Sequence, residues 1–113
     1  MQMISYCNKV NLVLEQAKLY SGGLSDELII DALAMNIGQI GEQVSSDKLS
    51  KELQAKYDLP WAEIKGFRNK AYHNYGTMDS KLITDIAIHY VPDLLSNLLK
   101  IKEDLENENN DVR

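Results

Sequence analysis

Residues that could carry chemistry cluster in one short segment. Arg68, His73 and Tyr75 lie within eight positions, in a chain of 113 residues with two arginines and two histidines. Arginine grips phosphate through a planar fork that stays charged, whereas histidine gains and loses protons near neutral pH. A fixed cation beside a proton carrier can cleave RNA without a metal. The segment therefore indicates phosphodiester chemistry, with no metal and no cofactor expected.

Metal-free RNA cleavage makes geometric demands on this segment. A base must take the 2′-hydroxyl proton, an acid must protonate the leaving 5′-oxygen, and a cation must stabilise the phosphorane. Arg68 and His73 are five residues apart, so on an ideal helix they diverge by about 140°. A working site needs either distortion at the helix end or two copies of the segment facing each other across a two-fold axis. The spacing alone also fits an ordinary surface histidine.

Several neighbours of Arg68 are candidates for RNA contact. Lys65 and Lys70 flank the arginine and form part of a local basic cluster. Asn69 shares a helix face with His73, because side chains four residues apart are neighbours on a helix. Tyr72 shares the Arg68 face and could stack on a base, although core packing fits it equally well.

Composition sets limits on the class of protein. The length fits one domain, and a net charge of −5 argues against a protein that coats nucleic acid indiscriminately. Any RNA contact should be confined to one cleft, and a folded RNA such as tRNA suits a net-acidic nuclease better than all messages do. No apolar run approaches the roughly 18–20 residues of a membrane span. Polar residues interrupt the N-terminal segment, so no signal peptide is expected and the default location is cytoplasmic.

Helical periodicity runs through the chain. Apolar residues step by three and four from Met3 to Ala17, and a second such stripe runs from Ile30 to Val44. We expect Ser21–Gly23 to end the first helix with a left-handed glycine, and Ser25 to cap the second. Gly38 and Gly41 interrupt the second stripe, which favours close approach of a neighbouring backbone. Cys7, the single cysteine, is expected to be a buried apolar side chain.

Three further helices complete the prediction. A short one, capped by Ser46 or Asp47, should run to about Tyr57, and Pro60-Trp61 should open a fourth that carries the reactive segment. A long last helix should begin at Asp79 or Ser80 and be kinked by Pro92. The prediction is an all-α bundle of four to five helices, with a single domain at 1–105 and a polar tail at 106–113. The wide apolar stripe of the last helix suggests a homodimer.

The ordered motifs resemble those of a known family. The run Arg68-x-x-x-x-His73-x-Tyr75 is similar to the motif of the HEPN superfamily, and more closely to that of the HepT-like toxins. Further similarity lies in Ile37–Glu42, in Leu59-Pro60-Trp61, and in Asp79 after the motif. The resemblance extends from about Ala32 to Leu99.

This resemblance implies a fold, an activity and partners. It implies a homodimeric helical bundle with a cleft on the two-fold axis, and metal-independent endoribonuclease activity restrained by a minimal nucleotidyltransferase antitoxin. Arg68 would stabilise the phosphate charge, His73 would act as general base or acid, and Asn69 would orient the imidazole or the phosphate. Tyr75 matches the tyrosine that the partner adenylylates in some members. Glu42 belongs to the family's Gly-Glu pair, either at the cleft or as a solvated carboxylate.

Two other functions fit the same residues. The bundle could be a non-catalytic module that binds a nucleotide or the nucleotidyltransferase, with Arg68 holding phosphate. It could also be a structural dimer in which Arg68 and His73 make ordinary interface hydrogen bonds. His89, on the last helix with no partner nearby in sequence, is expected to be structural.

Overall fold

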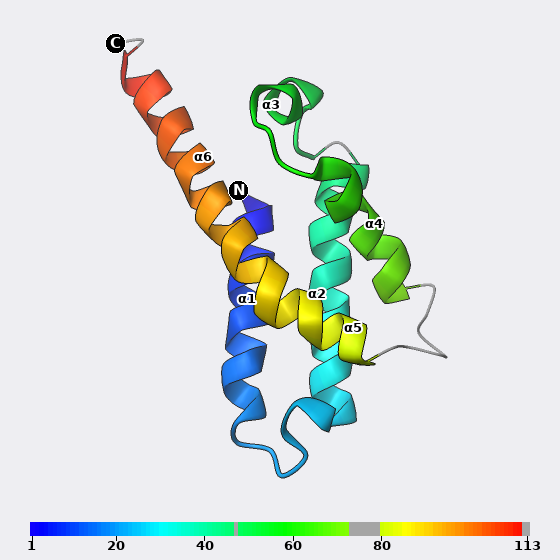
Figure 1. Cartoon of the computed structure of the whole chain (residues 1–113). Helices are drawn as coiled ribbons and strands as arrows, with labels where there is room; N and C mark the ends of the chain where they lie inside the picture. The colour runs from blue at the N-terminus through cyan, green and yellow to red at the C-terminus, as the bar shows by residue number, and fades with distance from the viewer. Residues whose placement is uncertain (47, 73–79, 112–113) are drawn as a thin grey trace.

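The computed structural model describes residues 1–46, 48–72 and 80–111; His73, Tyr75 and Asp79 lie outside the described residues. Figure 1 shows helices joined by turns, and the described part of the chain contains no strand. The elements are α1 (Gln2–Ala17), the short 3-10 helix η1 (Gly23–Ser25), α2 (Glu27–Ser45), α3 (Lys51–Lys56), α4 (Trp61–Tyr72), α5 (Ser80–Asp85), the π-helical turn η3 (Ile86–Tyr90) and α6 (Val91–Asp111). The predicted all-α bundle is confirmed.

The core forms around α2, which packs between α1 and α4 (Figure 1). The apolar stripe predicted for the first helix is buried except for Leu14, which is half-buried, and the stripe predicted for the second is buried throughout. From the other helices, Ile64, Phe67 and Leu98 are among the largest fully buried side chains. Phe67 also meets the ring of Tyr90 edge-on, with ring centres 5.0 Å apart. The buried side chains of Ile64 and Phe67 therefore hold α4 against the bundle.

The helix ends differ in detail from the prediction. The first helix stops at Ala17, and Gly23, with φ of 53°, takes its left-handed conformation as the first residue of η1. Asp26 rather than Ser25 caps α2, accepting a hydrogen bond from the Leu28 N–H at 2.9 Å. Ser50, rather than the predicted Ser46, caps α3 by accepting a hydrogen bond from the Leu53 N–H at 3.1 Å, and Asp47 lies outside the described residues. Both observed caps are residues one to four positions after the predicted ones, and their side-chain oxygens are equally suitable for capping.

Trp61 fixes the start of α4 to the preceding helix. Its Nε1–H donates to the carbonyl oxygens of Gln54 and Tyr57, each at 2.9 Å. Pro60 precedes the first turn, and its carbonyl accepts from the Ile64 N–H at 3.0 Å. Trp61 therefore ties the entry of α4 to the end of α3 through two hydrogen bonds.

The last helix bends where Pro92 was expected to kink it. The Val91 N–H bonds the Ile86 carbonyl, five residues back, so the turn before the proline is π-helical. Proline lacks an N–H and its ring clashes with the carbonyl four residues earlier, which a widened turn relieves. Figure 1 shows α5 and α6 running in different directions on either side of this turn.

Beyond the bend, α6 continues to Asp111 and projects past the bundle (Figure 1). Residues after Leu105 are thus helical as far as Asp111, and the Lys56 ammonium pairs with Glu108 across to α3. The Tyr57 hydroxyl donates to Asp104 at 3.3 Å.

The division into a domain at 1–105 and a tail at 106–113 stays a prediction. Within the described ranges, no helix combines the length and the apolar content needed to cross a bilayer.

Candidate active site

The position of Arg68 is set by a backbone contact between α2 and α4. A β-carbon added to Gly41 would lie 2.6 Å from the Arg68 nitrogen and 2.9 Å from the Ile64 carbonyl oxygen. Real β-carbons do not approach other atoms so closely, so only glycine permits this packing. The close approach expected at Gly41 is confirmed, and Gly38, one turn earlier, is buried.

Arg68 forms an ion pair with Glu42, the residue after this glycine. Its Nε lies 2.6 Å from Oε2 of Glu42, and the two side chains are 48% and 30% exposed. The sequence left Glu42 open between the cleft and a solvated role, and the structure places it beside the arginine. The Gly41-Glu42 pair marked this carboxylate as a candidate in the sequence. The sequence alone could not show that it lies beside Arg68, which is 26 residues further along the chain.

This ion pair matters more for orientation than for stability. Ion pairs between exposed side chains contribute roughly 0–1 kcal/mol, because solvent screens them and two flexible side chains must be ordered. Contact through Nε leaves the terminal amino groups of the guanidinium, which carry four of its five N–H donors, outside that contact. These groups form the fork that binds a phosphate bidentately. Arg68 is therefore held at its stem while half of its side chain remains accessible.

The other predicted residues within the described range lie on the same helix as Arg68. Lys65 and Asn69 are exposed, and Lys70 is half-buried. Lys65 lies one turn before Arg68, which puts both cations on adjoining faces of the helix. Tyr72 ends α4. The structure thus brings Arg68 together with Glu42, whereas the predicted places of His73 and Tyr75 remain predictions.

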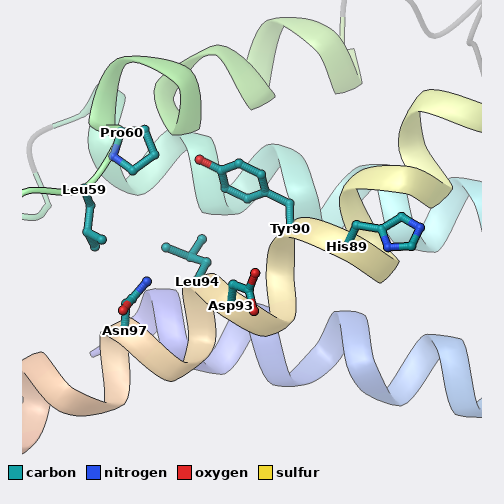
Figure 2. Close-up of a pocket in the computed structure, with 7 residues that line it drawn as sticks. All are labelled: Leu59, Pro60, His89, Tyr90, Asp93, Leu94 and Asn97. Carbon is teal, nitrogen blue, oxygen red and sulfur yellow. The ribbon is translucent and has the colours of Figure 1, made fainter.

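A separate surface cleft lies between the start of α4 and the bent last helix. It is lined by Leu59, Pro60, His89, Tyr90, Asp93, Leu94 and Asn97. Figure 2 shows the Tyr90 ring pointing toward Pro60, while His89 lies at the other end of the group. Burial raises the pKa of Tyr90 to about 12, and the nearby Glu63 carboxylate adds to the rise. The cleft shares no residue with the predicted site, and among the described residues its lining includes the acid Asp93 but neither lysine nor arginine.

Comparison with known proteins assigns the family. The chain matches the family described as Ribonuclease HepT-like over residues 3–101. This covers the chain from α1 to about the middle of α6, including Glu42 and Arg68. The chain therefore belongs to the HepT-like ribonuclease family, within the HEPN superfamily.

Two relatives illustrate the similarity. The chain is 30% identical over 86 residues to a protein of Caldanaerobacter subterraneus subsp. tengcongensis named "Putative RNase TTE0752", an overlap of 75% of this chain and 72% of that one. It is also 30% identical over 88 residues to "Putative RNase MJ0125" of Methanocaldococcus jannaschii, covering 77% and 74%. No solved structure matches the chain. Family and relatives together support a ribonuclease.

Proposed function

We propose that this protein is a metal-independent endoribonuclease and the toxin of a two-component system with a nucleotidyltransferase antitoxin. The observation that carries the proposal is Arg68, a half-exposed cation oriented through Nε at a glycine-enabled helix contact. Membership of a ribonuclease family supports the activity. The toxin role, the partner and the absence of a metal come from the resemblance of the Arg68–Tyr75 motif.

The proposed reaction needs no group beyond the side chains and the RNA. One His73 takes the proton of the 2′-hydroxyl, and the freed oxygen attacks the adjacent phosphorus. The bond from phosphorus to the 5′-oxygen breaks, and that oxygen takes a proton from a second imidazole. Arg68 stabilises the negative charge that builds on the non-bridging oxygens, a term that is often the largest in such reactions. The products are a 2′,3′-cyclic phosphate and a 5′-hydroxyl.

Two copies of the chain would supply the two imidazoles. Helix α4 is regular through Tyr72, so Arg68 and a residue five positions later diverge by about 140° if the helix continues. A partner copy can offer its histidine to this arginine. On α2, Leu28 and Met35 are 68% and 65% exposed and lie at seven-residue steps that lead along one face to Glu42. These two exposed apolar side chains, on the face of α2 that leads to the partner of the arginine, suit contact with a second copy.

Sedimentation tests this dimer face. We expect the wild type to sediment as a dimer and Met35→Lys to dissociate it, because a charge would be buried in an apolar contact. Leu12→Lys is the matched control, since Leu12 is 59% exposed on α1. A wild-type monomer, or equal effects of both substitutions, would reject the face.

Restraint by the antitoxin would act through Tyr75. An adenylyl group on its hydroxyl would place a bulky anion two residues past His73, which would fill the cleft and repel RNA phosphate. Lys65, Lys70 and Tyr72 would contact the RNA strand beside Arg68, and Asn69 would orient the imidazole or the phosphate. The substrate is expected to be a folded RNA such as tRNA.

The proposed activity is tested with purified protein and tRNA in EDTA. We expect cleavage to persist, with fragments that end in a cyclic phosphate and begin with a 5′-hydroxyl. Cleavage that requires an added divalent cation would reject the metal-free mechanism. RNA that stays intact while the protein binds ATP or a nucleotidyltransferase would favour a non-catalytic binding module instead.

A further inference from the structure

The environment of Glu42 is unusual for an acidic side chain beside a proposed RNA site. Its Oε2 atom is buried and has no hydrogen-bond partner among the described residues, yet it lies in ionic contact, at 2.6 Å, with Nε of a half-exposed arginine. A carboxylate at this place opposes RNA binding, because it repels phosphate and reduces the net positive charge around Arg68. A site selected only for RNA affinity would not keep it.

The geometry offers a reason for the carboxylate. An arginine side chain has many rotamers, and ordering it on substrate binding costs free energy. The backbone of Arg68 is already fixed against Gly41, and Glu42 holds the Nε end of the guanidinium. This ionic contact restrains the guanidinium before RNA arrives, and the rigid, planar group then has fewer orientations to lose on binding.

The structure assigns to Glu42 the role of a positioning residue for Arg68, a role that rests on the proposed ribonuclease activity. Glu42 acts through the arginine and does not touch the substrate. It weakens binding of the RNA ground state by its charge, and it raises the rate of the chemical step by holding the cation where the phosphorane develops. Glu42 therefore lowers the affinity for RNA and raises the turnover rate. A residue that only stabilises the fold would not produce this combination.

The test measures both quantities on full-length protein. Binding is measured with 2′-O-methylated RNA, which lacks the attacking hydroxyl, and kcat and KM with unmodified RNA. We expect Glu42→Gln to bind the methylated RNA roughly three- to tenfold more tightly, because one repulsive charge is lost close to the phosphate. We expect Glu42→Ala to lose roughly ten- to a hundredfold in kcat, since the guanidinium is no longer held.

Glu27→Gln is the matched control, because it removes the same charge from the exposed start of α2, about 22 Å away along the helix. It should leave both quantities at their wild-type values. A wild-type kcat in Glu42→Ala, or unchanged affinity for methylated RNA in Glu42→Gln, would overturn the assignment. If the wild type does not cleave RNA, the proposed function fails by itself; tighter binding by Glu42→Gln would then still support the placement of Glu42, and unchanged binding would overturn it.

Discussion

Gly41 and Arg68 lie backbone against backbone, so that a single methyl group on Gly41 would meet the Arg68 nitrogen at 2.6 Å. The contact fixes the separation of α2 and α4 at the level of the proposed site. It also places Glu42, the next residue, within reach of the arginine side chain. The glycine therefore shapes the site although it has no side chain of its own.

Substitution of this glycine should be costly. We expect Gly41→Ala to lower the free energy of unfolding by about 1–3 kcal/mol, because the added carbon has backbone rather than a flexible side chain as its neighbour. Urea unfolding measures the change.

Gly66 provides the comparison within α4. A β-carbon there would meet nothing within 4 Å. Gly66→Ala should therefore leave stability unchanged or raise it by up to about 1 kcal/mol, because alanine favours the helix. Equal losses in Gly41→Ala and Gly66→Ala would show that the close contact is not what glycine provides at position 41.

The two hydrogen bonds of Trp61 should be needed to hold α3 against the start of α4. We expect Trp61→Phe to cost roughly 1–3 kcal/mol, because the carbonyls of Gln54 and Tyr57 lose their shared donor. Amide hydrogen exchange should accelerate in α3 more than in α1 or α2. Uniform acceleration across the bundle would contradict a local role for the indole N–H.

The Cys7 thiol should resist modification in the folded protein. It is fully buried, and burial raises its pKa from 9.0 to about 12. The thiolate is the reactive form, so a thiol reagent at pH 8 should react only as fast as the chain opens. Rapid reaction without denaturant would contradict the buried position.

The raised pKa of the Cys7 thiol should also make the folded protein less stable at alkaline pH. The folded state favours the protonated thiol, so this contribution is complete below pH 9 and is lost as the pH rises from 9 toward about 12. The free energy of unfolding should fall over this range, and the fall should be smaller in Cys7→Ala. An identical pH dependence in both proteins would show that other groups control it.

Much of the fold follows from the sequence because each helix carries its own apolar stripe. Periodicity at steps of three and four needs no knowledge of neighbouring helices, and the residues of these stripes are largely buried. The caps were misplaced by a few residues because adjacent residues such as Ser25 and Asp26 can each cap a helix. The local backbone geometry, which sequence does not reveal, decides between them.

The site was predicted less completely. The motif located Arg68, and glycine at position 41 indicated a close helix contact. The pairing of Glu42 with Arg68 depends on the register between α2 and α4, which no local pattern specifies. The π-helical turn before Pro92 was predicted only as a kink, since the way a helix accommodates proline depends on packing around it.

The central claim is that Arg68 and His73 carry out the cleavage. The most direct measurement is the kcat/KM of the wild type, Arg68→Ala, Arg68→Lys and His73→Ala on one tRNA in EDTA, with thermal unfolding to confirm that each variant folds. We expect Arg68→Ala and His73→Ala to abolish cleavage, and Arg68→Lys to restore little, because lysine lacks the planar fork. Lys102→Ala, on the far part of α6, should cleave like the wild type. Cleavage that survives in folded Arg68→Ala and His73→Ala would contradict the assigned chemistry.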